Sequence, residues 1–398
     1  MAKQAIKKKT VTRPSVKDLK ASLGLNIDSN DLTMSSADKP MEFIPMPTAF
    51  YEALKIPGIP MGYLTIVTGW SNTGKSTLKY CLMANCINNG ILPIIYETEN
   101  HFDWKYAVNC GVKATPIYGE VEVEDFDEET GEITGTHKEE QIIDWDGEFI
   151  YFNTRKLAAR YGDNDYKQSK KTTKKRSVAV LEDIAYSINE FLDYQEEGKI
   201  QQPICFIWDS IGSIGSFRSY TSKTGNNMFD AGAITEAFST IVSHRIPSSK
   251  NVASPYTNTM FCVNKIWVDS VSNPMGAPSV ELKGGKSFFY NTRLCIHLGG
   301  VLKPATTRLE AVAKGEKYNY GIITKVRATK NQLPAPYNLT YEGKFACVHN
   351  GIIQEDQLGE YKAKNIGFFL EELNKAGKKA IEAKDVYFEE NEEEGPRE

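Results

Sequence analysis

The sequence predicts an α/β fold in which a mostly parallel central sheet is flanked by helices. Three observations predict this class. An apolar segment at 63–67 is followed by the residues Gly-Trp-Ser-Asn-Thr-Gly-Lys-Ser-Thr at 69–77, which match the pattern G-x-x-x-x-G-K-[ST] of a phosphate-binding loop. A helical pattern then covers 76–88, and a second apolar segment covers 91–96. Strand, helix and strand in close succession are typical of a parallel α/β unit.

The phosphate-binding loop predicts a nucleoside triphosphate as the ligand. In such a loop, backbone N–H groups and the positive end of the following helix face the phosphate oxygens. Lys75 is expected to reach the β- and γ-phosphates, and Ser76 to ligate Mg²⁺. The alternative, a chance match in a surface loop, is disfavoured by the strand before it. The loop residues expected to bind nucleotide are Gly69, Ser71, Asn72, Thr73, Gly74, Lys75, Ser76 and Thr77.

The composition is that of an ordinary soluble protein. The 398 residues are 41% hydrophobic and 25% charged, and they suit one large core with additions, or two domains. The seven cysteines form no C-x-x-C pair, so reduced thiols in a cytoplasm are expected rather than disulfides or a zinc ribbon. Because the sequence has neither an 18-residue apolar run nor an apolar leader, we expect no membrane span and no signal peptide.

The net charge of −4 conceals an uneven distribution. Residues 119–148 contain 13 acidic residues and one lysine, a local charge of −12, so the other 368 residues carry +8. The overall sign therefore does not exclude a nucleic-acid partner.

Changes in composition divide the chain into a core and its additions. Within 113–176 we expect an insert, with an acidic β-hairpin over 119–145 and a basic loop over 163–176 that contacts DNA or serves only as a solvated linker. A long helix is expected over 178–194 and another over 366–383, before a disordered acidic tail at 389–398. We expect three divisions: a basic segment over 1–42, an ATPase core over 43–350, and a helical region with the acidic tail over 351–398. The first contains a short helix at 16–23, which either docks on a neighbouring subunit or belongs to a free tail.

Three further apolar segments end in polar residues that suit phosphate chemistry. The segment 204–208 ends at Asp209, as in a Walker B strand whose carboxylate holds the water shell of Mg²⁺. The segment 94–96 leads to Glu97 and Glu99, either of which is a candidate to polarise an attacking water; the alternative is a solvated loop acid. The segment 260–263 ends at Asn264-Lys265, where a γ-phosphate sensor is expected.

Together these motifs resemble the RecA recombinase family. The motifs, in the family's order and approximate spacing, are Ile59-Pro60-Met61-Gly62, the loop 69–77, Glu97-Thr98-Glu99-Asn100-His101-Phe102-Asp103, Trp208-Asp209-Ser210-Ile211-Gly212, Asn264-Lys265-Ile266, Gly284-Gly285-Lys286 and Thr329-Lys330-Asn331-Gln332-Leu333-Pro334-Ala335-Pro336. The match covers about 43–351 and is similar to the UvsX-type bacteriophage branch, which implies a host-cell cytoplasm.

The resemblance implies a RecA-type P-loop ATPase core with a small N-terminal polymerisation segment. It implies a DNA-dependent ATPase that uses ATP and Mg²⁺ and polymerises on single-stranded DNA. Such a filament pairs the strand with homologous duplex DNA and exchanges strands, in recombination, repair or recombination-dependent replication. The implied partners are DNA, further copies of the chain, and a single-strand-binding protein or recombination mediator. The alternatives are a hexameric helicase built on the same core, disfavoured because 42 residues before the core leave no room for a further domain, and an ATP-dependent DNA-coating scaffold.

Several residue roles follow from the resemblance. Glu99 matches the glutamate that orients the hydrolytic water, and Asp103 and Tyr106 match the adenine contacts, although Tyr106 also suits a plain helix-core aromatic. Lys330 matches a lysine that reaches the phosphates of the neighbouring subunit. DNA-binding loops are expected at 216–227 and 265–286, where surface loops are the alternative. Their expected phosphate-contacting residues are Arg218, Lys223, Lys283, Gly284, Gly285 and Lys286.

Two positions depart from the family pattern. Lys265 stands where the family has glutamine, so the γ-phosphate is sensed by a point charge rather than by an amide, and the coupling of ATP to DNA is expected to differ. Gln332 stands where the family has a second lysine between subunits, which is expected to weaken the phosphate contact and change the rate of hydrolysis.

Overall fold

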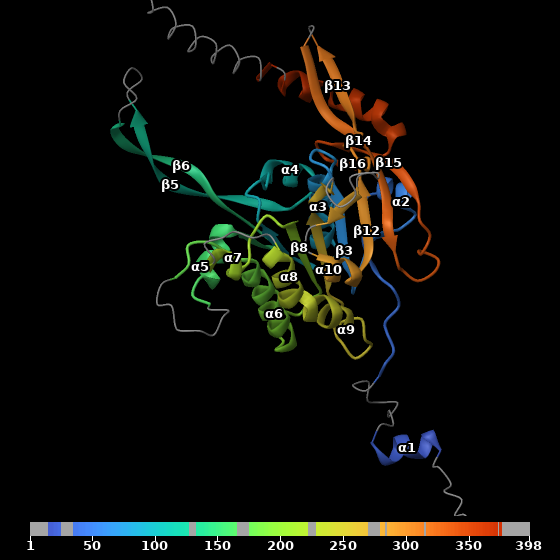
Figure 1. The fold of residues 1–398 in the computed structure, drawn as a ribbon. Coiled ribbons are helices and arrows are strands. Elements are labelled where there is room, and N and C mark those ends of the chain that lie inside the picture. The colour runs from blue at the N-terminus through green and yellow to red at the C-terminus, as the bar shows by residue number, and fades with distance from the viewer. Residues whose placement is uncertain are drawn as a thin grey trace, which may run out of the picture.

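A computed structural model describes residues 15–24, 35–126, 133–164, 175–221, 228–269, 279–282, 285–313, 316–372 and 374–375. Its described part has the predicted mixed α/β architecture, with a large, mostly parallel central sheet (Figure 1). The strand order in this sheet is β16-β15-β14-β12-β3-β9-β8-β4-β7, and β13 pairs with β14.

Six neighbouring strands form the parallel part of the sheet. Most of their residues are buried because helices cover both faces of the sheet, whereas β7 at the edge of the sheet is only partly buried. All the strands expected from apolar segments are present here, and β3, which precedes the predicted phosphate loop, is central. The parallel strands are β12 (Thr292–Leu298), β3 (Leu64–Gly69), β9 (Thr259–Asn264), β8 (Ile204–Ile211), β4 (Leu92–Glu97) and β7 (Ile150–Asn153).

An antiparallel extension continues the sheet beyond β12. Its strands are β14 (Glu316–Asn331), β13 (Thr307–Ala313), β15 (Glu342–Val348) and β16 (Gly351–Ile353). The last strand, β16, lies past the expected core boundary at residue 350, so the sheet extends into the region expected to be only helical. Residues 358–372 are helical, a start earlier than the expected 366, because Tyr361 and Phe369 both pack on Tyr320 of β14.

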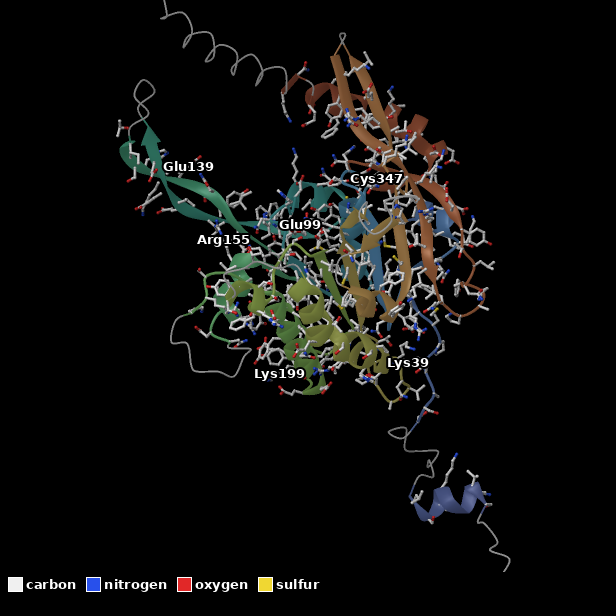
Figure 2. The ribbon with its side chains drawn as sticks, in the orientation of Figure 1. Lys39, Glu99, Glu139, Arg155, Lys199 and Cys347 are labelled. Atoms are coloured by element: carbon white, nitrogen blue, oxygen red, sulfur yellow. The ribbon has the colours of Figure 1, made fainter. Side chains whose placement is uncertain are left out.

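The predicted acidic hairpin is a long two-stranded ribbon separate from the central sheet. Its strands β5 (Ala114–Phe126) and β6 (Ile133–Gly147) pair antiparallel and project from the body of the molecule (Figure 1). Glu139 lies on the projecting part, far from Glu99 at the centre (Figure 2). At the base of the ribbon, Trp145 stacks on Trp104 with ring centroids 5.3 Å apart. This contact ties the base of the ribbon to the core.

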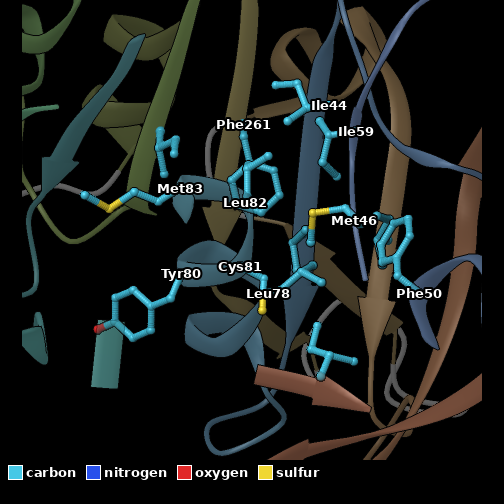
Figure 3. Packing of buried hydrophobic residues seen from close by; sticks show 14 of the residues in the cluster. Ile44, Met46, Phe50, Ile59, Leu78, Tyr80, Cys81, Leu82, Met83 and Phe261 are labelled. Atoms are coloured by element: carbon cyan, nitrogen blue, oxygen red, sulfur yellow. The ribbon is translucent and has the colours of Figure 1, made fainter. Parts of the chain in front are cut away.

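Two hydrophobic clusters hold helices on opposite faces of the sheet. Alternation along β3 directs Val67 to one cluster and Ile66 to the other. On the first face, Leu78 and Leu82 of α3 pack with Phe261 of β9 (Figure 3). The helices of this face are α2 (Thr48–Leu54), α3 (Lys75–Asn88) and α4 (Trp104–Asn109); those of the other are α5 (Thr154–Tyr161), α6 (Leu181–Glu196), α8 (Met228–Thr240), the π-helix η1 (Ile241–Arg245), α9 (Ile246–Ser248) and α10 (Gly285–Asn291).

The helix expected over 178–194 begins at Leu181. The backbone N–H of Val180 donates to Asp183 Oδ2 at 2.9 Å, which satisfies one of the open donors at the start of α6. Asp183 therefore sets the boundary, a local hydrogen bond that hydrophobic periodicity does not reveal.

The N-terminal elements are a short helix, α1 (Val16–Ser22), and a small antiparallel pair, β1 (Phe43–Pro45) with β2 (Gly58–Pro60). Val16 and Leu23 are exposed. The N-terminal basic residues, most of the expected basic loop, the end of the helix expected over 366–383 and the acidic tail lie outside the described residues. Among the described helices, none has the length and apolar character needed to cross a membrane.

Candidate nucleotide-binding site

A cavity of about 930 Å³ opens at the carboxyl end of β3. All nine residues of the loop 69–77 line it. The cavity also brings together predicted residues from other parts of the chain. Glu97 and Glu99 lie at the end of β4, Asp103 and Tyr106 at the start of α4, Asp209 in β8, and Lys265 directly after β9. Carboxyl ends of parallel strands meet at one edge of a sheet, which is where open α/β sheets bind ligands.

The loop has the backbone shape that its glycines permit. Gly74 has a φ of 95°, and a Cβ atom there would lie 2.4 Å from the Sγ atom of Cys347 on β15. Helix α3 begins directly after Gly74, and no side chain caps its first turn. The open N–H groups of that turn and the positive end of the helix dipole therefore face the cavity, as an anion site requires.

Lys75 lies across the mouth of the loop. Its Nζ donates to the carbonyl oxygens of Gly69 at 2.9 Å and Trp70 at 2.6 Å. Burial lowers the pKa of this ammonium group from its ordinary value, opposed by the charges of Asp209 and Glu99. These two carbonyl oxygens accept the hydrogen bonds that Lys75 is expected to donate to phosphate oxygens when a nucleotide is bound.

Glu99 is held in one orientation at the cavity wall. Its Oε1 accepts hydrogen bonds from the hydroxyl of Ser210 and from that of Ser213 at 3.1 Å, and it lies 3.2 Å from Lys265 Nζ. Partial burial acts to raise its pKa, but these hydrogen bonds and the Lys265 charge hold it below the usual range. Glu99 is therefore an ionised carboxylate, and the expected γ-phosphate sensor Lys265 contacts it directly.

Asp209 and Glu97 are joined by a buried lysine that the sequence reasoning missed. Lys79 Nζ lies 2.5 Å from Asp209 Oδ2 and 3.1 Å from Glu97 Oε2, and the Lys79 side chain is only 1% exposed. Burial opposes its charge, yet the two carboxylates raise its pKa, so Lys79 is an ammonium ion. The available signal was its spacing: Lys79 is four residues after Lys75, on the same face of α3.

The two carboxylates at the end of β4 have different surroundings. Glu97 is buried on Lys79, and its Oε1 accepts from the backbone N–H of Glu99 at 2.8 Å. The Glu99 side chain keeps 25% of its surface exposed beside the cavity. Of the two candidates to polarise water, the geometry therefore favours Glu99.

The residues expected to hold Mg²⁺ have suitable donor atoms. The hydroxyl of Ser76 and the carboxylate of Asp209 both line the cavity, and Mg²⁺ prefers oxygen ligands. In the part of the chain that the structure describes, no three His, Cys, Asp or Glu side chains form a metal-holding group. The donor set thus fits an ion that is bound by few protein groups and completes its shell with phosphate oxygens and water.

The lining of the cavity also includes the predicted adenine contacts. Asp103 Oδ1 accepts from the Tyr106 N–H at 2.9 Å and caps helix α4. The Tyr106 hydroxyl donates to the Val348 carbonyl at 2.9 Å and lies 2.7 Å from Thr77 Oγ1. Tyr106 thus packs in the core and also lines the cavity. Aromatic residues that were not predicted line the cavity as well: Tyr318, Tyr320, His349 and Phe368.

Lys330 lies elsewhere. Its Nζ donates to the carbonyls of Phe289 at 2.9 Å and Tyr290 at 3.0 Å, and it is not among the described residues lining the cavity. Lys330 pairs with Cys295 at the middle of β12, and Cys295 pairs with Ile66 of β3, three residues before the loop begins.

The two stretches expected to be DNA-binding loops partly form secondary structure. Exposed Arg218 lies on the short helix α7 (Phe217–Thr221), and the second stretch contains a hairpin of β10 (Ile266–Asp269) and β11 (Ser279–Leu282). Part of the second expected loop is therefore paired strands. Gly285 and Lys286 begin helix α10; the expected residues outside the described part are Lys223, Lys283 and Gly284.

The chain is similar in part to bacterial proteins. Protein RecA of Campylobacter jejuni subsp. doylei is 35% identical over 92 residues, and Protein RecA of Campylobacter hominis is 34% identical over 92 residues. Each alignment covers 23% of this chain and 26% of the relative, as does one at 33% identity with Protein RecA of Campylobacter lari. The chain therefore spans about a quarter of the length of these relatives. No protein-family model matches it.

Proposed function

We propose that this chain is an ATP-dependent DNA recombinase that polymerises on single-stranded DNA and exchanges strands with homologous duplex DNA. One observation carries the proposal: a phosphate-binding loop, an oriented ionised glutamate and Asp209 of β8 surround one cavity. The partial similarity to proteins named RecA supports the same class.

In the proposed reaction, ATP binds with its phosphates against the N–H groups at the start of α3. Lys75 exchanges the carbonyls of Gly69 and Trp70 for the β- and γ-phosphate oxygens. Ser76 and Asp209 would hold Mg²⁺, which would neutralise negative charge on those phosphate oxygens. Asp103 and Tyr106 contact the adenine.

The ionised Glu99 orients the attacking water and accepts its proton. The water oxygen forms a bond to the γ-phosphorus as the bond to the ADP oxygen breaks, and the products are ADP and phosphate. Ser210 and Ser213 fix the Glu99 carboxylate through hydrogen bonds to Oε1, so little reorganisation is needed during the reaction.

Lys265 is proposed to couple the nucleotide to DNA. In the structure its ammonium group lies on Glu99, and a γ-phosphate adds a second, stronger attraction for it. Lys265 directly precedes β10, the first element of the second proposed DNA segment. A movement of Lys265 towards phosphate would therefore shift β10, and release of phosphate would reverse it. Lys330, remote from the cavity of its own chain, is proposed to reach the phosphates of the next subunit.

The deciding experiment is electron microscopy of the full chain with single-stranded DNA and a slowly hydrolysed ATP analogue. A helical filament that requires the analogue supports the recombinase. A closed ring supports a helicase, and a coat without helical order that requires the analogue supports the ATP-dependent scaffold. Lys75→Ala is the control, because loss of this ammonium weakens binding of the nucleotide and should abolish both hydrolysis and the ATP-dependent filament.

A further inference from the structure

Two carboxylates lie side by side beneath the proposed magnesium site. Glu97 and Asp209 are register partners on the parallel strands β4 and β8. Like charges at facing positions of neighbouring strands repel each other. Both residues are also largely buried, with exposed fractions of 1% and 8%, so water screens this repulsion poorly.

Lys79 is the cation that holds this pair together. Its side chain extends from α3 to the two carboxylates, with Nζ 2.5 Å from Asp209 Oδ2 and 3.1 Å from Glu97 Oε2. The same ammonium lies 4.9 Å from the ring centroid of Tyr80 and 4.8 Å from that of Phe102, two aromatic faces that favour a cation. The lysine is therefore fixed on several sides and has little freedom to move.

Lys79 contacts residues that serve two parts of the proposed phosphate chemistry, the binding of Mg²⁺ and the orientation of water. Asp209 contacts Lys79 through one carboxylate oxygen, and the same residue lines the cavity, as Ser76 does. Glu97 contacts Lys79 through Oε2, and its Oε1 accepts from the Glu99 backbone N–H. A single buried amine thus orients the carboxylate proposed for Mg²⁺ and supports the backbone that carries the proposed water-orienting glutamate.

We propose that Lys79 is a positioning residue for the magnesium site, an internal cation that fixes Asp209 in the orientation needed to hold the hydrated Mg²⁺ of Mg·ATP. This inference rests on the proposed nucleotide-binding function. Lys79 touches neither nucleotide nor metal, and its effect passes through Asp209 in the way that outer-shell partners orient metal ligands. ATP without Mg²⁺ depends instead on the loop N–H groups and Lys75, and is expected to bind independently of Lys79.

The test compares binding of a fluorescent ATP analogue with Mg²⁺ and with a chelator. The quantity measured is the gain in affinity that Mg²⁺ provides. Lys79→Met, which keeps an unbranched side chain of similar length, is expected to reduce this gain by about tenfold or more, in the range found when supports of metal ligands are removed. Binding of the metal-free analogue should stay close to that of the parent protein.

A matched control separates positioning from stability. Arg176 and Asp183 form another buried ion pair, with Nη2 and Oδ1 2.6 Å apart, on the opposite face of the sheet and away from the cavity. Arg176→Met also breaks a buried pair, so it should lower the melting temperature as Lys79→Met does. It should leave the magnesium-dependent gain unchanged.

A second variant keeps the test decisive if Lys79→Met does not fold. In Lys79→Met with Glu97→Gln, the two like charges no longer face each other, and the glutamine oxygen can still accept from the Glu99 N–H. This double variant should fold, yet the gain should remain several-fold below that of the parent, because Asp209 still lacks its anchor. A gain equal to the parent's in a folded Lys79 variant overturns the inference. If the parent itself binds no nucleotide, the proposed function fails instead.

Discussion

Replacing Glu99 with glutamine tests the proposed catalytic geometry most directly. Glutamine has the same volume, and its carbonyl oxygen can accept from Ser210 and Ser213 as Glu99 Oε1 does. Only the negative charge is lost, and with it the charge attraction to Lys265, whose Nζ lies 3.2 Å from Glu99 Oε1. Because the Lys265 and Glu99 side chains are 45% and 25% exposed, losing this pair should cost no more than about 1 kcal/mol of unfolding free energy.

The expected effect on turnover is much larger. Removing a general base typically slows a reaction by about 10²–10⁴-fold, and a hundredfold loss corresponds to about 2.7 kcal/mol of transition-state stabilisation. Glu99→Gln should therefore lose at least roughly a hundredfold in the rate of DNA-stimulated ATP hydrolysis, while the melting temperature and ATP affinity change little. Filaments that form with ATP should consequently persist.

The matched comparison is Glu97→Gln, two residues earlier on the same chain segment. Glu97 is buried against Lys79, so its replacement should mainly lower stability. Phosphate release and thermal unfolding would be measured on both variants and the parent. Near-parental turnover in Glu99→Gln, or the hydrolytic defect in Glu97→Gln alone, refutes the assignment of Glu99.

Three further expectations concern charge and assembly. Lys265→Met should move the acid limb of the ATPase pH profile to higher pH, because partial burial then raises the pKa of Glu99 without opposition from the ammonium, and the ionised form is lost at a higher pH; an unmoved limb contradicts the contact. Lys330→Ala should shorten ATP-dependent filaments in electron micrographs while binding of the fluorescent ATP analogue is kept; filaments of parental length argue against a role between subunits. Replacing residues 120–140 of the exposed ribbon with a short turn should change the free energy of unfolding by less than about 1 kcal/mol and leave ATP hydrolysis intact, as surface changes usually do; a large loss of either would show that the ribbon supports the core.

The sequence alone was sufficient for the elements whose information is local. The strand before residue 69, the loop and helix α3 follow from an apolar segment, a glycine pattern and helical spacing that are contiguous in the chain. The acidic ribbon was likewise predictable from alternation around a turn, although β5 and β6 extend further than expected. The strand that contains Asp209 was recognisable for the same reason, although it continues to Ile211.

The tertiary structure decided which side chains meet. Lys79 is one of many lysines in the sequence, and only the packing of α3 against β4 and β8 places it between Glu97 and Asp209. The contact of Lys265 with Glu99 joins residues 166 positions apart. The choice of Glu99 over Glu97 as the water-orienting residue also depended on the structure, which buries Glu97 against Lys79 and leaves Glu99 partly exposed. Periodicity in the sequence predicts which face of a single helix or strand is buried. It does not predict which charged residues of neighbouring strands lie side by side, because that depends on the register between the strands, which is set only when the sheet forms.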